Sequence, residues 1–93
     1  MQLTKEEIKI AVYSIIFGAD GLPRKFALDD LALATDCFKA LNTCVNDDEE
    51  KTYKDSTVDF STSIKAFLMD SIKRQWGVVD GGHVLTLLKK LEE

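Results

Sequence analysis

The chain has 93 residues, of which 45% are apolar and 30% are charged, and its formal net charge is −4. These values fit one folded domain that spans residues 1–93, and they exclude an intrinsically disordered chain. Nucleic acid is unfavoured as the main ligand, because an acidic chain without a basic stripe neutralises few phosphates.

The N-terminal sequence, M-Q-L-T-K-E-E, has no basic leader and no small-residue cleavage site, so we do not expect a secretory signal peptide. The apolar run at residues 8–17 is about half as long as the roughly 20 residues that a membrane-spanning helix needs. We therefore expect no membrane segment and a cytoplasmic protein.

The first predicted helix, residues 5–17, is the most apolar element. Thr4 and Glu7 have the spacing of a capping box at its start. One predicted face carries Ile8, Ala11, Val12, Ile15 and Ile16, and the opposite face carries Ile10, Tyr13 and Phe17. A helix that is apolar all round is normally buried. Three other short helices cover two faces poorly, so we expect this helix at the centre of the fold, with a second copy of the chain on its second face.

The second predicted helix, residues 30–45, has Asp29 as its N-cap. The apolar half of this helix comprises Leu31, Leu33, Ala34, Cys37, Phe38, Ala40, Leu41, Cys44 and Val45. Cys37 and Cys44 would lie about two turns apart, which is too far for a disulfide between them. Both are expected to be buried thiols, which fits a reducing compartment.

Residues 46–56 have no apolar periodicity and are predicted to form a polar loop, with Tyr53 as its one anchor. The loop contains an acidic run, Asp47, Asp48, Glu49 and Glu50. Such a run is usually a solvated surface, although it could dock a basic partner. The loop lacks the glycine that a calcium-binding loop needs at its sixth position.

The third predicted helix, residues 58–76, is capped by Ser56 or Thr57 and stopped by Gly77. Serine and threonine at residues 61–63 weaken its first turn and could shift its start to Ser61.

The last segment allows two interpretations. Asp80 either caps a fourth helix or lies in the turn of a hairpin formed by residues 78–79 and 83–85. The helical spacing of Val84, Leu87, Leu88 and Leu91 favours the helix. The predicted fold class is therefore all-α, a compact four-helix bundle-like domain with the first helix central.

The residues predict no catalytic, cofactor-binding or metal site. His83 is the only histidine, and with two cysteines it makes no recognisable zinc pattern. The glycines after Asp80 are typical of an anion site at a helix start, but Asp80 would itself occupy the free amides. A third hypothesis, a Cys–His enzyme, needs an exposed and activated thiol. We therefore expect that the protein is not an enzyme.

The favoured hypothesis is a small non-enzymatic protein–protein interaction module, a regulator, inhibitor or adaptor, that forms a homodimer. The predicted dimer seam includes Ile10, Tyr13 and Phe17. Trp76 and the acidic run would be available to a protein partner. Aromatic side chains are favoured in these roles because binding energy concentrates on them. The alternative is a helix-turn-helix-like DNA-binding regulator that uses residues 65–90.

Overall fold

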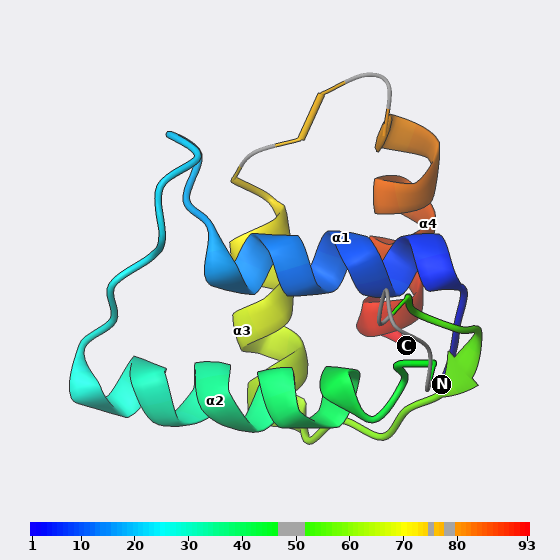
Figure 1. Ribbon diagram of the computed structural model, residues 1–93, viewed down its shortest axis with the longest axis horizontal. Coiled ribbons are helices and arrows are strands. Elements are labelled where there is room, and N and C mark those ends of the chain that lie inside the picture. Colours follow the sequence, from blue (N-terminus) through cyan, green and yellow to red (C-terminus); the bar gives the residue numbers. More distant parts are fainter. Residues whose placement is uncertain (47–51, 75, 78–79) are drawn as a thin grey trace.

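Four α-helices and one pair of two-residue strands form the described part of the chain, residues 1–46, 52–74, 76–77 and 80–93, in this computed structural model (Figure 1). The all-α prediction is confirmed. The elements in chain order are β1 (Gln2–Leu3), α1 (Lys5–Ile16), α2 (Leu28–Asn42), β2 (Ser56–Thr57), α3 (Thr62–Ile72) and α4 (Gly81–Glu92).

The helices form two antiparallel pairs, α1 with α2 and α3 with α4, and α1 crosses α3 (Figure 1). Both α1 and α3 pack against each of the other three helices. The predicted central place of the first helix is therefore shared with α3.

Helix α1 begins with the predicted capping box. The Glu7 amide donates to Thr4 Oγ1 over 3.2 Å, and the Thr4 amide donates to Glu7 Oε1 over 2.8 Å. The division of α1 into two apolar faces is wrong in detail: Ile10 is only 5% exposed, whereas Ile16, expected in the core, is 37% exposed. The other three helices thus cover most of α1 and leave one exposed stripe through Lys9, Tyr13 and Ile16.

Helix α2 begins at Leu28, two residues earlier than predicted, with Ala27 at the N-cap and no side-chain cap. The prediction of Asp29 as the cap is wrong, because this carboxylate lies in the first turn, where the helix dipole favours a negative charge. The fully buried residues of α2 are Ala34, Cys37 and Leu41. Leu31 and Phe38, which the apolar pattern placed inside, are exposed.

Helix α3 begins at Thr62, because Ser61 Oγ accepts the Ile64 amide over 3.2 Å and caps it. The earlier start with a cap at Ser56 or Thr57 is wrong: these two residues form β2, which pairs antiparallel with β1. The chain between β2 and α3 buries Val58 and Phe60.

The C-terminal segment 81–92 is helical, so the predicted fourth helix is confirmed and the hairpin is wrong. Asp80 occupies the N-cap position of α4, but its side chain makes no capping hydrogen bond. The prediction that Asp80 caps this helix is therefore wrong, and its carboxylate is left for other interactions.

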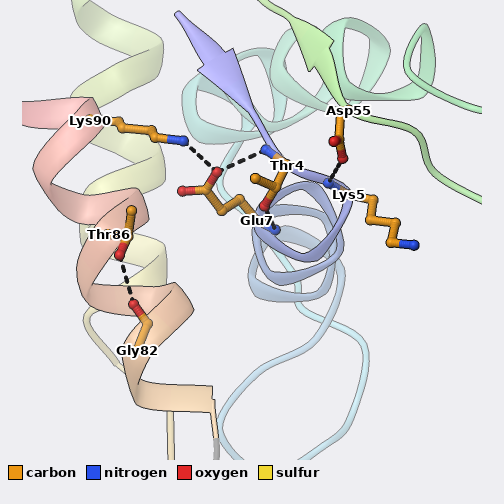
Figure 2. A network of polar contacts seen from close by, with 7 residues as sticks. All are labelled: Thr4, Lys5, Glu7, Asp55, Gly82, Thr86 and Lys90. Carbon is orange, nitrogen blue, oxygen red and sulfur yellow. Dashed lines mark hydrogen bonds and ion pairs between the residues drawn. The ribbon is translucent and has the colours of Figure 1, made fainter.

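A partly buried ion pair joins α1 to α4 (Figure 2). Lys90 Nζ lies 2.6 Å from Glu7 Oε1, and the Glu7 side chain is 1% exposed. Burial opposes the ionisation of Glu7, but the hydrogen bonds from Lys90 and Thr4 outweigh it and lower the pKa of this carboxyl. Figure 2 also shows the Lys5 amide bonded to Asp55, which ties α1 to the segment before β2.

The segment that leads from α2 toward β2 is anchored by Tyr53, as predicted. The Tyr53 backbone pairs with that of Val45, and the Lys54 amide donates to the Cys44 carbonyl over 2.9 Å. The Tyr53 side chain is half-buried and packs against the core. The acidic run at residues 47–50 lies outside the described residues.

Candidate functional site

Three aromatic side chains gather on the exposed stripe of α1. The rings of Tyr13 and Trp76 meet edge to face, with centroids 5.6 Å apart and planes inclined by 61°. Tyr13 also contacts Phe17, with a centroid distance of 4.9 Å. Tyr13 is 43% exposed, while Phe17 and Trp76 are half-buried. Three of the predicted partner-binding residues therefore lie together on one surface.

Trp76 is held by a hydrogen bond to a buried residue of α1. It lies beyond the end of α3, where the sequence pattern still predicted helix, and its indole Nε1 donates to Ser14 Oγ over 3.0 Å. Ser14 is fully buried in α1, and its hydroxyl donates to the Ile10 carbonyl over 2.8 Å. The two bonds run from the indole N–H through the Ser14 hydroxyl to the Ile10 carbonyl, and they orient the indole ring against α1.

A groove of about 430 Å³ opens beside these rings, between α1 and the start of α4. We call it the aromatic groove, and its lining residues are Glu6, Lys9, Ile10, Tyr13, Trp76, Asp80 and His83. The lining therefore combines three apolar or aromatic side chains with two carboxylates, one ammonium and one imidazole.

The structure changes the predicted role of Ile10. This residue was expected in a dimer seam, but it is packed within its own protomer and only contributes to the wall of the aromatic groove. The sequence did not indicate Glu6 and Lys9 as site residues. Glu6 and Lys9 lie seven and four residues before Tyr13, which places all three on one side of a helix, and this is the available signal.

A second apolar surface lies on α2, away from the aromatic groove. Leu28 is 81% exposed, and Leu31 and Phe38 are also exposed. With Thr35 these residues have the 3-4-3 spacing of a coiled-coil seam. We call this set of four residues the α2 stripe.

The two thiols do not form a reactive site. Both cysteines are free and buried, and burial raises the pKa of Cys37 to about 12. His83 instead lines the aromatic groove. Within the described ranges, no group of three or more His, Cys, Asp or Glu side chains has a metal-binding arrangement.

The segment considered for DNA binding does not have the usual geometry of a helix-turn-helix. Residues 73–80 connect α3 to α4, whereas a helix-turn-helix has a turn of only about 3–4 residues. The two helices run antiparallel (Figure 1).

No helix in the described part of the chain is both long enough and apolar enough to cross a membrane. No protein-family model, curated protein or solved structure matches this chain. The aromatic groove and the α2 stripe are therefore the two surfaces from which we infer a function.

Proposed function

We propose that the protein is a non-enzymatic interaction module, acting as a regulator, inhibitor or adaptor, that binds another protein through the aromatic groove. One observation carries this proposal: Tyr13 and Trp76 are accessible from the groove while the bond to Ser14 fixes the indole. A fixed ring loses little conformational entropy when a partner binds. Tryptophan and tyrosine are also the side chains on which binding energy concentrates.

The composition of the aromatic groove supports a protein ligand. Protein interfaces combine an apolar centre that contains aromatic residues with a polar rim. In the aromatic groove Tyr13, Trp76 and Ile10 supply the apolar and aromatic part, and Glu6 and Asp80 supply polar groups. The fully buried thiols fit a reducing compartment, and we place the protein in the cytoplasm.

We further propose that the protein forms a weak homodimer through the α2 stripe, and not through the predicted seam on α1. In an antiparallel two-fold pair of α2 helices, Leu28 of one copy would face Phe38 of the other, and Leu31 would face Thr35. Such self-complementarity is what a two-fold interface requires. A helix of 15 residues is about 22 Å long, so one helix pair buries less than the ~1,200–2,000 Å² of a stable complex.

Photo-crosslinking in the native host tests the interaction function. A benzophenone amino acid at Lys9, on the groove wall, should crosslink a defined partner, and the crosslink should be lost when Trp76→Ala is added. The matched control carries the same amino acid at Leu85, which is 67% exposed on α4 and does not line the groove. Absence of a crosslink at position 9, identical products from both positions, or products insensitive to Trp76→Ala would overturn the proposal.

A further inference from the structure

We infer that the aromatic groove binds a cationic side chain, lysine or arginine, presented by the partner protein. This inference rests on the proposed function and adds the chemistry of the group that is recognised. It depends on three observations: the angle between two aromatic rings, the free state of two carboxylates, and the balance of charge around the groove.

The rings provide the first element of a cation site. The planes of Tyr13 and Trp76 are inclined by 61°, their centroids are 5.6 Å apart, and both rings line the aromatic groove. The face of an aromatic ring is negative and attracts a cation within about 6 Å of the centroid, most strongly for tryptophan. The hydrogen bond to Ser14 holds the indole in this arrangement.

Two carboxylates provide the second element. Asp80 occupies the N-cap position of α4 without capping it, and Glu6 lies one turn before Lys9 and Ile10 on α1. Among the described residues, neither carboxylate makes a hydrogen bond or an ion pair. Both line the same groove as the two rings and are available to pair with a guanidinium or an ammonium.

The charge balance selects this class of ligand over the others. Apart from His83, the groove carries two negative charges and one positive charge, that of Lys9. An acidic side chain would be repelled, and a purely apolar one would desolvate the carboxylates without giving them a partner. A lysine or arginine can place its methylene stem on the rings and its charged head beside the carboxylates.

Lys9 would compete with a cationic ligand for the aromatic groove. Its side chain is exposed on the groove wall, and its ammonium repels any cation that enters. Lys9→Gln should therefore strengthen binding of a cation, whereas Glu6→Gln and Asp80→Asn should weaken it. These opposite signs distinguish recognition of charge from simple apolar contact.

A fluorescence titration tests the inference, because Trp76 is the only tryptophan of the chain. The probe is N-acetyl-arginine amide at about pH 8 and low ionic strength, and the matched control is N-acetyl-citrulline amide, which has the same shape without the charge. We expect a saturable change of Trp76 emission with the arginine probe and binding of the citrulline probe that is roughly tenfold or more weaker. Glu6→Gln and Asp80→Asn should each weaken arginine binding severalfold, and Lys9→Gln should strengthen it.

Equal binding of the two probes, or no saturable change with either, would overturn the cation site. Unchanged arginine binding in both Glu6→Gln and Asp80→Asn would do the same. Circular dichroism of each variant shows whether the fold is retained, and every variant keeps Trp76. If the probes fail while the crosslink from position 9 persists, the groove binds a partner by another chemistry and the proposed function stands. Loss of that crosslink removes the function itself.

Discussion

Trp76 and Ser14 join the connection after α3 to the buried side of α1, through a hydrogen bond between residues 62 positions apart. The bond leaves one part of the indole against the core and another part at the wall of the aromatic groove. The packing of the helices and the shape of the groove therefore depend on the same side chain.

The substitution Ser14→Ala should loosen Trp76. It removes the hydroxyl that accepts the indole N–H and leaves that donor without its partner, which costs about 1–3 kcal/mol when the donor is buried. Trp76 is half-buried, so we expect a loss of about 1 kcal/mol in the free energy of unfolding, measured by chemical denaturation. Acrylamide quenching of Trp76 fluorescence should increase.

Ser63→Ala is the matched control, because Ser63 is an exposed serine within α3. Its effect on stability should stay within about 0.5 kcal/mol. Unchanged quenching in Ser14→Ala would contradict the role of this hydrogen bond in fixing the groove wall.

Much of this fold could be predicted from local sequence signals. The capping box at Thr4 and Glu7 and the apolar periodicity of 81–92 are properties of neighbouring residues, and both gave the correct helix. The strand pair β1–β2 could not be found in this way, because two residues carry no periodicity and their partner lies about 54 positions away. The same is true of the partnership between Glu7 and Lys90, 83 residues apart.

The candidate site could be predicted only in part. Sequence indicated Tyr13, Phe17 and Trp76, and the structure brings them together. It also indicated Ile10, but this residue is buried. A helical wheel shows which residues are apolar, and it does not show how much of each face the other helices cover. For that reason Leu31 and Phe38 were assigned to the core, although the packing of α2 leaves them exposed.

Acidification should weaken the fold through Glu7. In the folded protein the pKa of Glu7 lies below its ordinary value near 4.5. The ionised carboxylate therefore stabilises the fold at pH values above the pKa that Glu7 has in the unfolded chain. This contribution is lost as the pH falls from about 4.5 through the lowered pKa. The free energy of unfolding, measured against pH by denaturant titration, should fall in this range.

Two variants assign that acid loss to the ion pair. Glu7→Gln should flatten the decline, and an unchanged slope would refute the assignment. Lys90→Met should cost about 2 kcal/mol at neutral pH, which is less than the ~3–5 kcal/mol of a fully buried pair, because Lys90 is 31% exposed.

Self-association should depend on α2 and not on α1. Leu31→Glu places a charge in the middle of the α2 stripe, so it should raise the dimer dissociation constant by roughly tenfold or more in sedimentation equilibrium at micromolar concentration. Tyr13→Glu should leave that constant unchanged and impair the aromatic groove instead. Dissociation by Tyr13→Glu alone would return the seam to α1, and a strictly monomeric wild type would remove the dimer.

The cysteines should react only after unfolding. With both thiols buried and the pKa of Cys37 raised to about 12, labelling of the native protein at about pH 8 should be about 100-fold or more slower than labelling in denaturant. Lys39→Cys, at an exposed position of α2 outside the α2 stripe, supplies a fast control in the same helix. Rapid native labelling of Cys37 would reopen the hypothesis of a thiol enzyme.

The affinity of the crosslinked partner, once purified, for the wild type and for Trp76→Ala tests the proposed binding surface most directly. Isothermal titration calorimetry should show binding to Trp76→Ala that is at least roughly tenfold weaker, the loss typical of an aromatic residue that anchors an interface. Leu85→Ala, at an exposed position outside the groove, should bind as the wild type does. Equal affinities for the wild type and a folded Trp76→Ala protein would contradict the central claim that the partner binds at Tyr13 and Trp76.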